Sequence, residues 1–115
     1  MATYFFDTSA LVKRYYPEVG TDRVDEIIET NNEVVISTLL VIETVSAFRR
    51  KYDRGEVTMA EMESSIDVFF REALDEFMIL PLHESLLTFS FDLILTDGLR
   101  TLDSLQLSAA LSIHA

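Results

Sequence analysis

The sequence predicts an α/β protein built on a short parallel β-sheet. Three brief apolar runs, at residues 4–6, 34–37 and 78–82, are each followed by segments with helical spacing of apolar residues. The connections between these runs are too long for hairpins and contain helices, which is typical of parallel strands joined by right-handed crossovers. With 115 residues and no linker or internal repeat, we expect one domain spanning residues 1–115.

The first strand ends in a carboxylate. Three aromatic residues run directly into Asp7, and the hydroxyl residues Thr8 and Ser9 follow, either of which is placed to cap a helix over residues 9–16. Ligands of open α/β sheets bind outside the carboxyl ends of the strands, so Asp7 lies where such a fold carries out chemistry. The alternative interpretation is that Asp7 is only a turn or capping residue.

The middle of the chain predicts a helix, a buried strand and a second helix. Thr21 begins the first helix, and the β-branched run at 34–37 is the strand. Thr38 caps the next helix, which Gly55 ends. Basic residues near that end, including Arg49 and Arg50, either complement the helix dipole or contact phosphate groups.

The remaining elements are a long helix, a strand and two further helices. Thr58 to Glu61 form a capping box that opens the long helix, which extends to residue 77. Pro81 lacks a backbone N–H for sheet pairing, so we expect it at the end of the third strand, or that strand at an edge of the sheet. We expect Ser85 to cap a helix that runs to residue 97, and Thr101 to cap the last one.

Composition restricts the function classes. The chain has no cysteine, which excludes disulfides and thiolate chemistry and suits a cytoplasmic location. No apolar run reaches membrane-spanning length. The net charge of −11 disfavours nonspecific binding to long duplexes but suits a divalent cation or a basic partner.

Three acids stand at comparable places in the predicted fold. Asp7 ends the first strand, Glu43 lies early in the helix after the second strand, and Asp103 lies in the first turn of the last helix. Glu43 and Asp103 interrupt apolar surroundings, where a charge is tolerated mainly when it is paired or bound to metal. We therefore expect the three carboxylates to meet at one edge of the sheet.

Such a cluster has a definite chemistry. Carboxylates about 5 Å apart repel by about 3 kcal/mol per pair at an effective dielectric of 20, which a cation or a bound proton must offset. Oxygen ligands without histidine or cysteine favour Mg²⁺ or Mn²⁺ over zinc. A hard cation of this kind activates water and stabilises charge on phosphate, so the sequence predicts metal-dependent phosphodiester hydrolysis.

Three segments together resemble the motifs of PIN-domain ribonucleases, in particular the VapC-type toxins of toxin–antitoxin pairs. They are Phe6 to Leu11, Ile42-Glu43 ahead of the basic run, and Leu99 to Ala110. The resemblance implies a three-layer α/β/α sandwich on a short parallel sheet and a Mg²⁺- or Mn²⁺-dependent endoribonuclease. Asp7, Glu43 and Asp103 match the first three acids of the family, which hold the metal and are catalytic, and Ser9 matches a residue that supports the first acid.

The resemblance also implies partners. VapC-like proteins commonly form homodimers and are inhibited by a cognate VapB-like antitoxin, often through a basic residue placed in the acidic site. The apolar side of the helix over residues 59–77 independently suggests a dimer face. The family usually continues into a fourth strand with a further aspartate, so we expect this chain to be either C-terminally truncated or an unusually short member.

Two other functions are consistent with the same residues. A catalytically weak or inactive PIN-fold module that binds a basic protein would account for the missing fourth acid. A phosphoryl-accepting receiver domain is disfavoured because the third strand ends without an aspartate.

Overall fold

The structure is a computed structural model that describes residues 2–113, in which three strands form one parallel sheet in the order β1–β2–β3. Tyr4 pairs with Val34 in β1 and β2, and Val34 pairs in turn with Phe77 in β3. The elements in chain order are β1 (Thr3–Phe5), α1 (Thr8–Val12), α2 (Thr21–Glu29), β2 (Glu33–Ser37), α3 (Thr38–Asp53), α4 (Met59–Glu76), β3 (Phe77–Leu80), α5 (Glu84–Asp97) and α6 (Thr101–Ser112).

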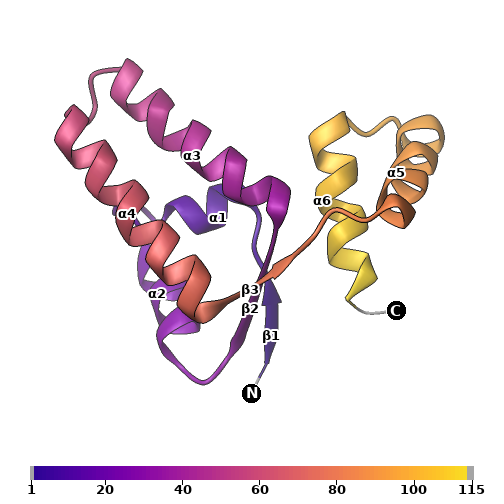
Figure 1. The fold of residues 1–115 in the computed structure, drawn as a ribbon, viewed down its shortest axis with the longest axis horizontal. Helices are drawn as coiled ribbons and strands as arrows, with labels where there is room; N and C mark the ends of the chain where they lie inside the picture. The colour runs from indigo at the N-terminus through magenta and orange to yellow at the C-terminus, as the bar shows by residue number, and fades with distance from the viewer. Residues whose placement is uncertain (1, 114–115) are drawn as a thin grey trace.

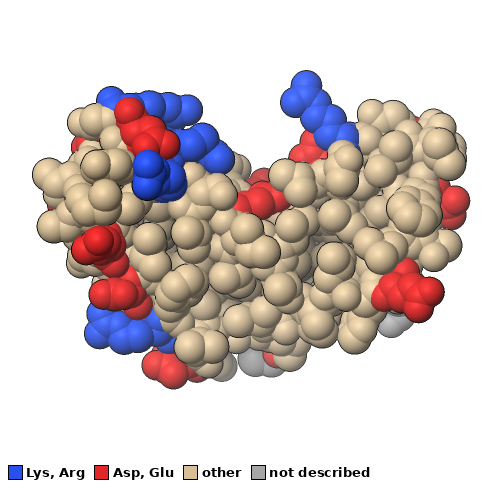
Figure 2. Space-filling model, turned by 45° about the horizontal axis from the view of Figure 1, so that its top comes forward, with Lys and Arg blue, Asp and Glu red and all other residues tan. Residues whose placement is uncertain are grey.

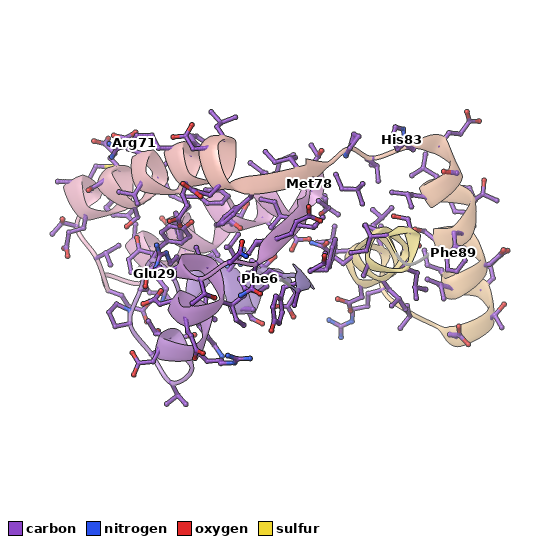
Figure 3. All side chains as sticks on the ribbon, turned by 90° about the horizontal axis from the view of Figure 1, so that it is seen from below. Phe6, Glu29, Arg71, Met78, His83 and Phe89 are labelled. Carbon is purple, nitrogen blue, oxygen red and sulfur yellow. The ribbon has the colours of Figure 1, made fainter. Side chains whose placement is uncertain are left out.

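The sheet separates two layers of helices, which confirms the predicted α/β/α architecture. Helices α1 to α4 lie on one side of the strands, and α5 and α6 lie together on the other (Figure 1). The same division is visible from below, where His83 lies at the start of α5, at the end of the connection from β3 into the second layer (Figure 3). No helix among residues 2–113 is long and apolar enough to cross a membrane.

The main hydrophobic core lies between the sheet and α1 to α4. Val34 and Ile36 point into it from β2, because alternate strand residues face the same side. Phe48 of α3 and Phe69 of α4 are fully buried, and their rings meet edge to face with centroids 6.1 Å apart. This core fixes α3 against the sheet and thereby sets the position of Glu43.

An ion-pair network ties the turn after α1 to α2 and α4 beside this core. Arg14 donates to both carboxylate oxygens of Glu72 at 2.8 and 3.1 Å, and also to Asp25 and Glu29. Tyr15 donates to Glu72 at 2.8 Å. The hydrogen bonds to Glu72 raise the pKa of Arg14, while burial, followed by the bond to Glu72, raises the pKa of Tyr15.

The second layer is held by small polar residues. Ser90 of α5 and Ser108 of α6 are buried and share a hydrogen bond of 2.9 Å. Ser108 also donates to the carbonyl of Ser104 one turn earlier. Small side chains at these positions let the two helices approach closely, while several large apolar residues of the pair stay exposed, among them Leu87, Phe89, Phe91, Leu95, Leu107 and Leu111.

All predicted elements form, but most helix starts differ from the prediction. The residue that precedes the predicted cap is the actual N-cap for α2 (Gly20), α3 (Ser37) and α6 (Arg100), and α5 begins after His83 rather than at Ser85. The reason is that Thr21, Thr38 and Thr101 already have helical backbone, and the Ser37 hydroxyl accepts the Leu40 amide instead.

Three further boundaries were tested. The capping box from Thr58 to Glu61 is confirmed, with both reciprocal hydrogen bonds present. Helix α1 ends at Val12 rather than residue 16, because residues 13–16 continue as turns. Strand β3 begins at Phe77, which the sequence pattern assigned to the preceding helix, and ends immediately before Pro81.

Candidate active site

The three predicted acids line one pocket of about 330 Å³ at the carboxyl end of the sheet. Asp7 comes from the end of β1, Glu43 from the second turn of α3 and Asp103 from the first turn of α6. Thr8, Ser9, Leu102 and Gln106 complete the lining. The parallel sheet brings the first two acids to the same edge, and the α5–α6 pair carries the third to it.

Asp7 is the N-cap of α1. Its Oδ1 accepts the backbone N–H of Ala10 at 2.8 Å and the hydroxyl of Ser9 at 3.1 Å. The prediction that Thr8 or Ser9 caps this helix is therefore wrong, because Asp7 is the residue with extended backbone and a free carboxylate at the helix start. The Asp7 side chain thus both caps α1 and lines the pocket, and the Ser9 hydroxyl supports it by donating a hydrogen bond to its carboxylate.

Glu43 is the most enclosed of the three acids. Thr8 donates to its Oε2, and its Oε1 is buried without a hydrogen-bond partner among the described residues. A buried carboxylate oxygen without a hydrogen-bond donor lowers the stability of the folded state unless a positively charged group reaches it. This atom is consistent with a site for a cation.

Two expectations about the acids are corrected. Asp103, which was expected on a buried apolar face, is exposed, as is Asp7, because both stand at helix starts on the pocket rim. Within residues 2–113, no three acids or histidines form a group that could hold a metal ion, so a close cluster of the three carboxylates is not present in this arrangement. An all-oxygen donor set still fits Mg²⁺ or Mn²⁺. The cap bonds of Asp7 use its Oδ1 and leave its Oδ2 available to a cation.

The surroundings of the pocket are polarised. Figure 2 shows acidic side chains at the floor of a hollow between the α3–α4 side and the α5–α6 side, with basic side chains on both rims. On the α6 rim, Arg100 precedes the helix and borders a second depression that adjoins Asp103. An anionic polymer that enters the hollow therefore passes cations on the rims before it reaches the acids.

The predicted RNA contacts Arg49 and Arg50 lie farther along α3. Both side chains are exposed, and their backbone positions lie about 9 and 10.5 Å from that of Glu43 along the helix axis at 1.5 Å per residue. Arg49 pairs with Asp53 at 2.9 Å and lies over the ring of Tyr52. Arg49 therefore has a structural role on its own helix, and the two arginines lie outside the acidic pocket.

Gln106 is a polar residue of the pocket to which the sequence analysis assigned no role. It lies one helical turn after Asp103, on the same face of α6, and this three-residue spacing is the signal that would have identified it. Its Oε1 accepts the hydroxyl of Ser37 at 2.9 Å, while its Nε2 is buried without a partner among residues 2–113.

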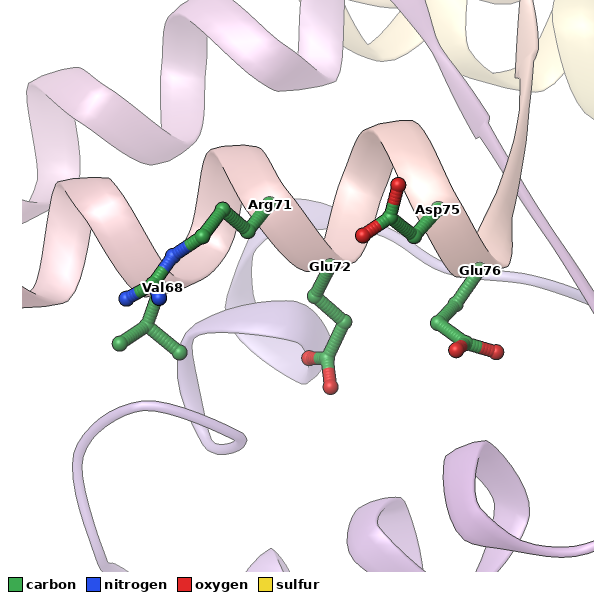
Figure 4. Close-up of a pocket in the computed structure, with 5 residues that line it drawn as sticks. All are labelled: Val68, Arg71, Glu72, Asp75 and Glu76. Carbon is green, nitrogen blue, oxygen red and sulfur yellow. The ribbon is translucent and has the colours of Figure 1, made fainter.

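A third depression, of about 310 Å³, lies along α4 and is lined by Val68, Arg71, Glu72, Asp75 and Glu76 (Figure 4). All five side chains come from one helix face. Its most enclosed acid, Glu72, is already bonded to Arg14 and Tyr15. We interpret this depression as a consequence of the structural ion-pair network.

Comparison with known proteins places the fold. Residues 4–115 match the PIN domain family. A search of curated proteins returned no match. The crystal structure of VapBC2 from Rickettsia felis, bound to a DNA fragment from its promoter, has a chain that superimposes with a TM-score of 0.66 at 17% identity, covering 100% of this chain and 84% of that one. Since the family match extends over nearly the whole sequence, this chain belongs to the PIN domain family.

Proposed function

We propose that this chain is a metal-dependent endoribonuclease of the VapC type, the toxin of a toxin–antitoxin pair. The observation that carries the proposal is that Asp7, Glu43 and Asp103 line one pocket in which a Glu43 oxygen is buried and unpaired among the described residues. PIN-domain membership and the fold of a VapBC2 chain support it.

The chain's own residues would act as follows. Thr8 and the start of α1 hold Glu43 and Asp7 at the pocket, and Asp103 closes it from α6. Bound there, Mg²⁺ or Mn²⁺ would supply an activated water and stabilise charge on the phosphate. Three carboxylates offset the cation's charge and leave a net negative site, which favours release of an anionic product.

The substrate we propose is single-stranded or locally unpaired RNA. A chain with a net charge of −11 binds long duplexes poorly, so recognition depends on a short basic approach to the site. The basic rims of the hollow seen in Figure 2 provide such an approach. Of the basic side chains, we propose that Arg49 and Arg50 contact RNA that extends beyond the pocket along α3.

The proposed partner is a VapB-like antitoxin, whose basic residue would compete with the cation for the acids. The proposed homodimer uses α4, where Met59, Val68, Phe70 and Leu74 are exposed. We expect the protein to act in the cytoplasm. Sedimentation of the purified chain as a monomer would contradict the dimer without affecting the nuclease.

Cleavage of a structured RNA by purified, antitoxin-free protein tests the proposal. The reaction is run with Mg²⁺, with Mn²⁺ or with EDTA, beside Asp103→Asn and the control Asp97→Asn, which removes an exposed acid at the end of α5. We expect metal-dependent cutting that Asp103→Asn abolishes and Asp97→Asn retains. A folded protein that never cuts, or cuts equally in EDTA, would contradict it; the former would favour the non-catalytic binding module.

A further inference from the structure

The acidic pocket contains two buried polar atoms that complement each other. Glu43 Oε1 can only accept hydrogen bonds and Gln106 Nε2 can only donate them, and neither has a partner within residues 2–113. Both residues line the same pocket of about 330 Å³. Because native proteins rarely leave buried polar groups unpaired, a donor and an acceptor at one site point to each other.

The orientation of the Gln106 amide is fixed by its other end. The Ser37 hydroxyl accepts the N–H of Leu40 at 3.0 Å, so its single proton is free to be donated to Gln106 Oε1, at 2.9 Å. The NH₂ group must then face away from Ser37. The N-cap of α3 therefore sets which end of the amide faces the pocket.

The orientation of Glu43 is fixed in a similar way. Thr8 at the start of α1 donates to Oε2, which leaves Oε1 as the oxygen with free lone pairs. A carboxylate oxygen has two lone-pair sites and can accept a hydrogen bond while it also binds a cation. Two hydroxyls from two helix starts thus leave a free donor and a free acceptor in one pocket.

We propose that Gln106 is a positioning residue that orients Glu43 for the cation. Its Nε2–H donates to Glu43 Oε1, the one donor and one acceptor of the pocket that are buried without another partner among the described residues. The role in cation binding rests on the proposed function; the pairing itself does not. Partners of this kind orient metal ligands, and their loss typically weakens metal affinity by about 10–100-fold.

Side-chain NMR of the metal-free protein tests the pairing. Gln106 is the only glutamine in the chain, so glutamine-selective ¹⁵N labelling yields a single side-chain NH₂ pair, which Gln106→Met must remove. We expect Glu43→Ala to shift one proton of this pair upfield, and the control Asp7→Asn, which changes another acid of the pocket, to leave it in place. An NH₂ pair unmoved by Glu43→Ala overturns the pairing.

Calorimetric titration with Mn²⁺ tests the consequence. Gln106→Met keeps the side-chain length, and we expect it to weaken Mn²⁺ binding by about 10-fold or more. The control Ser112→Ala changes a residue of α6 whose hydroxyl bonds to Ala109, and should bind as wild type does. Unchanged affinity in Gln106→Met overturns the positioning role. Wild-type protein that binds no Mn²⁺ overturns the proposed function instead, and the NMR result still decides the pairing.

Discussion

Replacing Asp7 separates its capping role from its charge. The Asp7 carboxylate accepts the Ala10 N–H at the start of α1 and also lines the acidic pocket. Asparagine caps helices about as well as aspartate, whereas alanine cannot accept the bond and typically costs about 1 kcal/mol. Asp7→Asn therefore removes one negative charge from the pocket while it keeps the cap.

The magnitudes follow from these contacts. Asparagine loses a favourable interaction with the helix dipole of about 0.5 kcal/mol, and this loss is opposed by the relief of repulsion from Glu43 and Asp103. We expect the free energy of unfolding of Asp7→Asn to lie within about 0.5 kcal/mol of the wild-type value. That of Asp7→Ala should be lower by about 1 kcal/mol, since the exposed hydrogen bond from Ser9 adds little. RNA cleavage should be lost in both variants.

The assay is urea unfolding followed by circular dichroism, beside the cleavage reaction. Stability of Asp7→Asn equal to that of Asp7→Ala would refute the capping argument, because the amide would not be replacing the carboxylate. Full cleavage by a folded Asp7→Asn would refute its role as a metal ligand. The two refutations are independent, because one concerns stability and the other activity.

Three further predictions concern the fold. Arg14→Met should cost about 3 kcal/mol in urea unfolding, since it strips two hydrogen bonds from the mostly buried Glu72, and a cost below about 1 kcal/mol would contradict this. Tyr15→Phe should lose about 1 kcal/mol at neutral pH. Because folding raises the pKa of Tyr15, the stability that its hydroxyl contributes is present below pH 10.0, the ordinary pKa of tyrosine, and is lost as the pH rises toward the folded pKa. Wild-type protein that stays more stable than Tyr15→Phe in alkaline unfolding would count against the hydrogen bond. The hydrogen bond from the backbone N–H of Thr58 lowers the pKa of Glu61 in the folded state. The stability that Glu61→Gln loses is therefore present above pH 4.5 and disappears as the pH falls through the folded pKa. Thermal unfolding of both proteins over a range of acidic pH checks this, and a stability difference that does not change with pH would contradict it.

The sequence was sufficient for the architecture because local signals and the global fold agree. The run at 34–37 is apolar on both faces, and both faces are covered, by α1–α4 on one side and by α6 through Gln106 on the other. The capping box at Thr58 was identifiable because its four residues satisfy each other without distant partners. Helix starts at residues 21, 38 and 101 were misplaced by one because a hydroxyl can occupy either the cap or the first turn.

The site was predictable in its members but not in its geometry. Parallel topology alone predicts that Asp7 and Glu43 share an edge, yet the place of Asp103 in the pocket depends on how α5 and α6 pack. The apolar neighbours of Asp103 suggested burial, but Leu102 is 47% exposed and lines the pocket. The bond from Ser37 to Gln106 joins residues 69 positions apart, which no local pattern reveals.

Direct binding of Mn²⁺, followed by electron paramagnetic resonance, tests the central claim that the three carboxylates hold one cation. Wild-type protein and Asp97→Asn should bind Mn²⁺ equally. Asp7→Asn, Glu43→Gln and Asp103→Asn should each weaken Mn²⁺ binding by more than about 10-fold, because loss of a residue that only supports a metal ligand already weakens binding by about that much. Binding that all three substitutions leave unchanged would contradict the account, because the metal would then lie outside this pocket.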